Sequence, residues 1–207
     1  MNLPDEIKTI DEFNEVTITI NRSRFIGQAY HVETEEEVKT HITNSKKKFF
    51  EASHHCYALK LANGKIRYSD AGEPNGTAGI RILNAIEHFD IKNQLVVVSR
   101  IFGGIRLGIG PLGKAYYESA FKLLDKSKIK VQQLFQKVSI SSQFEQLGFI
   151  HRILALHNSI LTDSDFENNV KISCLLKVSE IEQISKVLID SGKRKISINF
   201  YKDFIYK

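Results

Sequence analysis

The stretch from residue 95 to residue 124 constrains the fold more than any other part of the chain. Leu95–Val98 is apolar and β-branched, which is typical of a strand buried on both faces. Apolar residues then recur at helical spacing, at Tyr116, Ala120, Leu123 and Leu124. The stretch therefore predicts a buried strand and a helix that are joined by a loop rich in glycine.

The predicted loop contains five glycines, and all of its charged residues are basic. Glycine lets backbone N–H groups approach a ligand closely, and a helix N-terminus offers unpaired N–H groups with partial positive charge. We therefore predict a phosphate-binding or nucleic-acid-binding loop formed by Arg100, Gly103, Gly104, Arg106, Gly108, Gly110 and Lys114. The alternative is that these glycines only make tight turns and close helix contacts.

Two known phosphate-binding motifs match this loop by letter but fail in context. Gly108–Gly113 reads G-x-G-x-x-G, but it begins well after the strand ends, whereas a dinucleotide motif starts there. Gly108–Lys114 reads G-x-x-x-x-G-K, but Ala115 follows where a P-loop needs Ser or Thr for Mg²⁺. We expect no cofactor.

The charge of the chain is unevenly distributed. The 207 residues carry a net charge of +5, yet residues 1–37 hold nine acidic against three basic residues, a net −6. Residues 92–130 hold eight basic against two acidic residues, a net +6. This basic excess coincides with the glycine-rich loop and suits phosphate, RNA or an acidic protein surface.

Other sequence features narrow the class of protein. No apolar run approaches membrane-spanning length, and the acidic N-terminus does not resemble a signal peptide, so we expect a cytoplasmic protein without a membrane partner. Cys56 and Cys174 are isolated from each other, which fits neither a disulfide framework nor zinc spacing. No His, Cys or acidic cluster has ligand spacing, so we expect no metal site.

The first half of the chain predicts alternating strands and helices. Thr34 and Glu37 form a capping box for a helix that runs to about Ser45, and Thr77 is positioned to cap another helix. A second glycine-rich loop, residues 69–79, carries Asp70 and Glu73. These carboxylates are candidate acid, base or metal-binding groups, or else residues that stabilise a turn. The predicted strands cover residues 15–20, 24–32, 52–61, 65–68 and 95–98.

The second half changes character near residue 134, where glycine becomes rare and alternation regular. Strands are predicted at 137–142, near 160, at 170–178 and at 196–200, with helices at 144–158 and from Ser179 to a stop at Gly192. This βαββαβ order predicts a ferredoxin-like domain. We expect an α+β protein with domains at 1–132 and 133–207.

Four blocks of the sequence resemble the signatures of the IMPACT/YigZ family: Ser23-Arg24-Phe25, His54-His55-Cys56, Asp70–Gly79 and Arg100–Tyr116. The family's loop usually reads R-Y-F-G-G-I-K-L-G-x-G-G-L-x-R-A-Y, and its acidic loop D-D-G-E-P-x-G-T-A-G. This chain departs from those patterns at Ala71, Ile101, Pro111 and Lys114.

The resemblance implies an N-terminal domain with the fold shared by domain IV of elongation factor G, several ribosomal proteins and GHMP kinases. It implies a C-terminal domain similar to domain V of elongation factor G. Eukaryotic members of the family are translational regulators that act through protein partners. The resemblance therefore implies RNA or the ribosome as a partner.

Our leading hypothesis is a non-enzymatic protein that binds RNA or the ribosome and is linked to translation, with no catalytic residues. In this hypothesis, phosphates are contacted by Arg100, Arg106 and Lys114, and the nucleic-acid-binding surface extends to Arg24 and His54. One alternative is an enzyme or small-molecule binder in which Asp70 and Glu73 face the basic loop, as GHMP kinases use a glycine-rich loop for phosphates. Another is a module that binds an acidic protein surface.

Overall fold

The structure, a computed structural model, describes residues 3–166, 169–191 and 195–207. These residues form two compact units, one of residues 7–131 and one of residues 132–207 together with 3–6. Residues 3–6 fall within the first domain that we predicted from the sequence, but they are part of the second unit. There the carbonyl of Asp5 accepts a hydrogen bond from Leu134 N at 2.7 Å. The described residues contain two antiparallel sheets and five α-helices, which confirms the α+β class.

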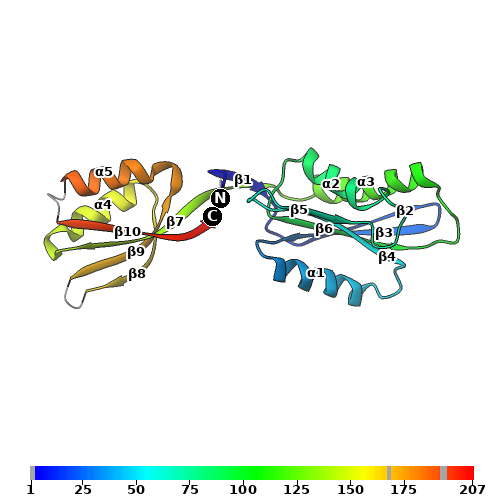
Figure 1. Ribbon diagram of the computed structural model, residues 1–207, viewed down its shortest axis with the longest axis horizontal. Coiled ribbons are helices and arrows are strands. Elements are labelled where there is room, and N and C mark those ends of the chain that lie inside the picture. The colour runs from blue at the N-terminus through cyan, green and yellow to red at the C-terminus, as the bar shows by residue number, and fades with distance from the viewer. Residues whose placement is uncertain (1–2, 167–168, 192–194) are drawn as a thin grey trace. The chain divides into compact units, whose positions relative to one another are not determined.

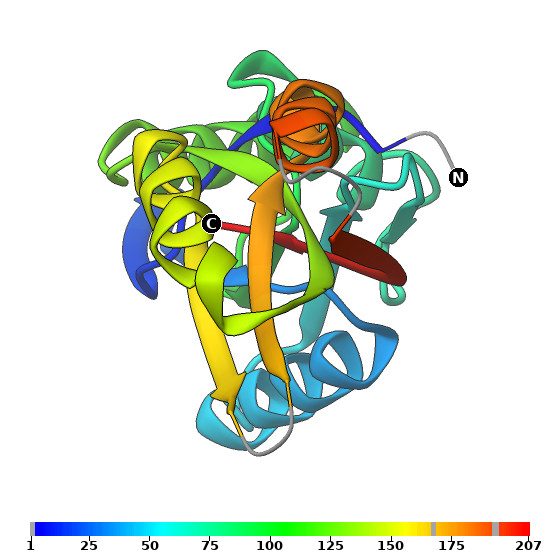
Figure 2. The same ribbon diagram turned by 90° about the vertical axis from the view of Figure 1, so that its left-hand side faces the viewer.

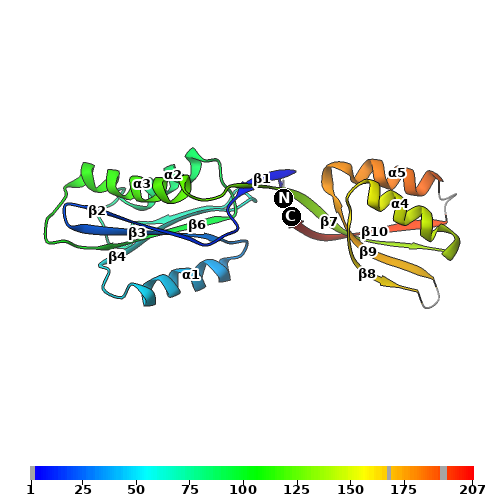
Figure 3. The same cartoon turned by 180° about the vertical axis from the view of Figure 1, so that it is seen from behind.

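The first unit is a three-layer arrangement around one sheet with the strand order β2-β3-β6-β4-β5. Helix α1 covers one face of this sheet, and α2 and α3 cover the other (Figures 1 and 3). The elements from the start of the chain through this unit are β1 (Glu6–Thr9), β2 (Asn14–Ile20), β3 (Ser23–His31), α1 (Glu35–Lys48), β4 (His54–Lys60), β5 (Ile66–Ser69), α2 (Gly79–His88), β6 (Gln94–Ile101) and α3 (Ile109–Asp125).

The central strand β6 is buried on both faces, as its sequence predicts. Leu95 and Val97 join the core beneath α1, whereas Val96 and Val98 join the core beneath α2 and α3. Burial on both sides explains why this strand is a continuous apolar run without alternation. It fixes the end of β6, and hence the start of the glycine-rich loop, within the sheet.

Local capping signals explain where the helices begin, with one correction. The capping box of α1 is confirmed: Thr34 Oγ1 accepts from Glu37 N at 3.2 Å, and Glu37 Oε2 accepts from Thr34 N at 3.0 Å. The predicted cap at Thr77 is wrong, because its hydroxyl instead donates to the carbonyl of Pro74 at 2.6 Å and α2 has Ala78 at its N-cap position.

The second unit has the predicted order of elements, and β10, β7, β9 and β8 lie side by side in its sheet. Figure 2 shows β8 and β9 as neighbouring strands, with β8 at an edge. Ser179 lies in a 3₁₀ turn, Val178–Glu180, and the predicted stop at Gly192 lies outside the described residues. The elements are β7 (Lys130–Ser142), α4 (Leu147–Leu156), β8 (Ile160–Asp165), β9 (Val170–Lys177), α5 (Ile181–Ser191) and β10 (Ile196–Tyr206).

Apolar side chains of α4 and α5 pack with those of the sheet to form the core of the second unit, which includes Val138, Ile140, Ile172 and Leu188. No helix in the described part of the chain combines the length and the apolar character that crossing a bilayer requires.

Candidate functional site

The glycine-rich loop connects β6 to α3 and is held against the turn between β2 and β3. A Cβ on Gly103 would overlap the backbone of Arg22 in the β2–β3 turn, and Gly103 N donates to Ser23 Oγ at 3.2 Å. Gly103 therefore serves close packing, and its N–H is already used. Gly104 and Gly108 adopt φ values of +83° and +79° with open space beside them, so each makes a turn that disfavours a side chain.

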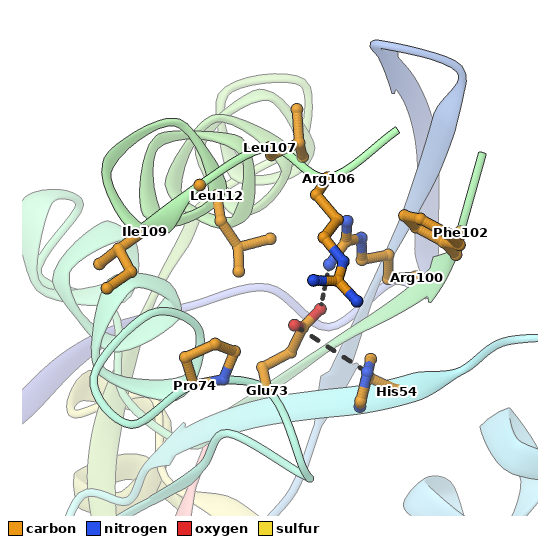
Figure 4. Close-up of a pocket in the computed structure, with 10 residues that line it drawn as sticks. His54, Glu73, Pro74, Arg100, Phe102, Arg106, Leu107, Ile109 and Leu112 are labelled. Carbon is orange, nitrogen blue, oxygen red and sulfur yellow. Dashed lines mark hydrogen bonds and ion pairs between the residues drawn. The ribbon is translucent and has the colours of Figure 1, made fainter. Parts of the chain in front are cut away.

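The loop forms one wall of a cavity of about 440 Å³ in the first unit (Figure 4). The opposite wall comes from the 69–79 loop and from the start of β4. Charged, aromatic and aliphatic side chains therefore face one space. The lining residues are His54, Glu73, Pro74, Arg100, Phe102, Arg106, Leu107, Gly108, Ile109 and Leu112.

A buried ion pair joins the two loops at the base of this cavity. Arg100 Nη1 donates to Glu73 Oε1 at 2.7 Å, and the two side chains are only 8% and 4% exposed. The hydroxyl of Tyr116 in α3 donates to the same oxygen at 2.8 Å. The Arg100 guanidinium also lies over the rings of Phe25 and Phe102, at 5.4 and 5.5 Å. Arg100 is thus fixed by internal contacts.

Burial also sets the acidity of two groups beside this ion pair. Burial, with Cys56 and Glu73 nearby, raises the pKa of Tyr116 far above its usual range, so its hydroxyl stays a donor. Burial raises the pKa of the Cys56 thiol to about 12, and the thiol donates to the carbonyl of Asp70 at 2.9 Å. A thiol held in its protonated form is a poor nucleophile.

Asp70 stabilises the 69–79 loop and the start of α2. Its Oδ1 accepts from Ala78 N and Gly79 N at 2.9 and 2.8 Å, and its Oδ2 accepts from Gly76 N at 2.9 Å. Burial acts to raise the pKa of Asp70, but these three hydrogen bonds outweigh it and the pKa lies below the ordinary value. Asp70 therefore supplies the cap predicted for Thr77 and does not line the cavity.

His54 links β4 to the same loop. Its Nδ1 is 2.9 Å from the carbonyl of Ala71, which requires Nδ1 to carry the proton, and its Nε2 lies 3.9 Å from Glu73 Oε2. Gly72, at φ +87°, packs against the imidazole. The ring is therefore oriented by the backbone, and Nε2 points toward the carboxylate (Figure 4).

The cations predicted from the sequence do not form one cluster. Arg106 lines the cavity and pairs with none of the residues that the structure describes. Arg24 lies on the α1 side of the sheet, where it pairs with Glu51 at 3.6 Å. Lys114 lines a second hollow of about 430 Å³ with Arg81, Asn84, Ile109, Gly110, Gly113 and Tyr117.

Sequence reasoning missed the roles of Phe102 and Tyr116. Both stand in the family-like block from Arg100 to Tyr116, but nothing in the pattern indicates that Tyr116 reaches Glu73, 43 residues earlier. Across residues 3–166, 169–191 and 195–207, no group of three His, Cys, Asp or Glu side chains could hold a metal ion.

The site lies within the region that matches a known protein family. Residues 21–124 match the family model described as the Impact N-terminal domain. The chain belongs to the IMPACT family. This confirms the resemblance drawn from the four sequence blocks, and all residues of the cavity fall inside the matched region.

Similar IMPACT family members include proteins that match nearly the whole chain. IMPACT family member YvyE of Bacillus subtilis is 31% identical, over 92% of this chain and 88% of its own length. IMPACT family member YigZ of Escherichia coli is 26% identical, over 86% of this chain and 90% of its own length. A crystal structure described as that of "an hypothetical protein" matches with a TM-score of 0.71 and 25% identity, covering 97% of this chain and all of that one.

Proposed function

We propose that this two-domain protein binds RNA, on the ribosome or in another translation complex, through phosphates of a strand that crosses the start of α3. The observation that carries this proposal is the pair of hollows that flank the first turn of α3. They share Ile109. Arg106 lines one of them beside the paired Arg100, and Lys114 and Arg81 line the other. We propose that successive phosphates of one strand occupy the two hollows.

The charges in the two hollows are available to a ligand. Arg106 has no partner among the described residues, and Lys114 is 77% exposed with only a surface contact to Glu118 at 3.7 Å. Surface ion pairs of this kind contribute about 0–1 kcal/mol, so a phosphate can replace one readily. By contrast, the charges of Arg100 and Glu73 neutralise each other inside the cavity.

The backbone at the start of α3 favours the same ligand. No side chain among the residues that the structure describes caps this helix, and Gly108 precedes it. Because Pro111 has no N–H, Ile109 and Gly110 provide the unpaired donors of the first turn. Unpaired N–H groups and the helix dipole together attract anions, and phosphates are common ligands at such positions.

The link to translation is supported by family membership, because eukaryotic relatives that the sequence resembles are translational regulators. The βαββαβ unit fits the ferredoxin-like domain, similar to domain V of elongation factor G, that the resemblance implies. The link to translation thus follows from fold and family, whereas the proposed phosphate contacts follow from named residues of this chain.

The test is fluorescence anisotropy with a labelled single-stranded RNA at several salt concentrations. Arg106→Ala and Lys114→Ala should each weaken binding and reduce the slope of log K against log salt by about 1, because each removes one phosphate contact. Lys39→Ala is the matched control, since Lys39 is an exposed lysine on α1, which covers the other face of the sheet. If the double variant Arg106→Ala/Lys114→Ala bound RNA with wild-type affinity, the proposal would be refuted. It would also be refuted if, after nuclease treatment of a cell lysate, the wild-type protein bound an acidic protein and bound no RNA in the anisotropy assay.

A second candidate function is binding of a small phosphorylated substrate, because the cavity places Glu73 and His54 opposite Arg106. This candidate makes a different prediction: a free phosphorylated compound binds with a dependence on Arg106, while single-stranded RNA does not bind. Asp70 has no part in it, because its carboxylate is occupied by three backbone N–H groups.

A further inference from the structure

The cavity contains an aromatic surface that phosphate binding alone does not use. Phe102 follows directly after β6, lines the cavity, and is 45% exposed. Its ring lies against the Arg100 guanidinium at 5.5 Å, and the close packing of Gly103 against Arg22 fixes the backbone beside it. An exposed ring next to the proposed phosphate-binding turn is the arrangement on which a nucleic-acid base can stack.

The cavity also offers a hydrogen-bond acceptor at its base. Glu73 Oε1 accepts from both Arg100 and Tyr116, whereas Oε2 accepts no hydrogen bond from the residues that the structure describes. Its neighbour His54 Nε2 is 3.9 Å away, which is too far for a hydrogen bond. An ionised carboxylate can only accept, so Oε2 suits a ligand N–H group.

One further polar group of a residue that lines the cavity has no internal partner. The buried Nε–H of Arg100 has no acceptor within the described part of the chain. An unpaired buried donor is unfavourable, and this one belongs to a side chain that lines the cavity. The uncapped start of α3 borders the same cavity through Gly108 and Ile109 and favours an anionic ligand there.

We propose that the cavity receives one unpaired nucleotide of the bound RNA. Its base stacks on Phe102, its phosphate lies at Arg106 and the start of α3, and a base amino group donates to Glu73 Oε2. This inference rests on the proposed RNA-binding function and names the ligand of the cavity. The cavity volume of about 440 Å³ falls in the range of small-molecule sites, so it accommodates a single nucleotide and no duplex.

The acceptor at Glu73 predicts a preference among bases. Cytosine, adenine and guanine carry exocyclic amino groups, whereas uracil has none. The ring N–H of uracil lies between two carbonyl oxygens, which a carboxylate repels, so uracil is the poorer donor to Glu73 Oε2. We expect oligocytidine and oligoadenosine to bind more tightly than oligouridine. We also expect single-stranded RNA to bind more tightly than a blunt duplex of the same length, since paired bases are stacked within the duplex and cannot enter the cavity.

The test compares Phe102→Leu with the wild-type protein by fluorescence anisotropy, using labelled oligocytidine, oligouridine and a blunt RNA duplex. Stacking of one base is worth about 1–3 kcal/mol, so Phe102→Leu should weaken oligocytidine binding about 5-fold or more. Its binding of the duplex should stay within about 2-fold. Phe50→Leu is the matched control, because Phe50 is 85% exposed and does not line the cavity.

The outcomes separate this inference from the proposed function. If Phe102→Leu binds oligocytidine as the wild type does, while Arg106→Ala still weakens binding, the nucleotide site is refuted and phosphate binding stands. If oligouridine binds as tightly as oligocytidine, the role of Glu73 Oε2 is refuted. If neither single-stranded nor duplex RNA binds the wild-type protein, the proposed function fails and this inference fails with it.

Discussion

Replacing Glu73 by alanine should destabilise the first unit strongly, because it leaves Arg100 as an unpaired buried cation. The two side chains are 4% and 8% exposed and are joined at 2.7 Å. Removing one partner of such a pair costs about 3–5 kcal/mol. The Tyr116 hydroxyl also loses its acceptor, but the cavity admits water to the vacated space. We therefore expect a loss of about 3 kcal/mol for Glu73→Ala.

A double-mutant cycle distinguishes this cause from simple loss of packing. Arg100→Leu in the Glu73→Ala background removes the unpaired charge, so the double variant should be about 2 kcal/mol more stable than the two single losses predict. Urea unfolding measures the free energy of unfolding of each variant. Hydrogen exchange of amides in β6 and α3 shows whether the lost stability belongs to the first unit. Glu118→Ala, which breaks only the exposed contact with Lys114, should cost less than about 1 kcal/mol. A loss below about 1 kcal/mol for Glu73→Ala, or strict additivity, would refute the reasoning.

Three further predictions concern the loops and the thiols. The pKa of Asp70 is lowered by folding, so its contribution is present above the unfolded value of about 3.9 and is lost as the pH falls through the folded value. Asp70→Asn should therefore lower the free energy of unfolding by about 1–2 kcal/mol at pH 7. In urea titrations, the difference in stability between wild type and variant should disappear below about pH 4. A difference that stays constant down to pH 2 would contradict this prediction. Gly103→Ala should destabilise by more than about 2 kcal/mol, because its Cβ meets the Arg22 backbone, and a neutral effect in the same titration would be inconsistent with the loop. Burial raises the pKa of Cys56 and Cys174 to about 12, so a thiol reagent at pH 8 should modify them no faster than the protein unfolds, in contrast to rapid labelling of exposed thiols.

The elements of the fold were predictable where one local pattern determined them. The apolar run Leu95–Val98 is stable only as a strand buried on both faces. The capping box of Thr34 and Glu37 predicts a helix start because the two residues hydrogen-bond each other directly. The βαββαβ order of the second unit followed from alternation and helical spacing. The family was recognisable because its blocks combine several such local constraints.

The site was only partly predictable, because its contacts join distant residues. Arg100 looked like a phosphate ligand, yet its charge is paired with Glu73, 27 residues earlier. The register places Arg100 opposite Phe25, so Arg100 shares a face with that residue and the neighbouring Arg24 lies on the other face. Strand register therefore decides which basic side chains lie on the same face of the sheet. The positions of the basic residues in the sequence do not reveal that register.

The distribution of hydrogen bonds divides the site residues into two groups with different expected phenotypes. Asp70, Arg100 and Tyr116 use their main polar groups on internal partners, so substituting them should lower stability and binding together. Arg106 and Phe102 are exposed and have few internal contacts, so substituting them should lower binding alone. Glu73 belongs to both groups, because Oε1 holds the loops together while Oε2 faces the cavity. Measuring stability and RNA affinity on the same variants would therefore separate the framework of the cavity from the surface that meets the ligand.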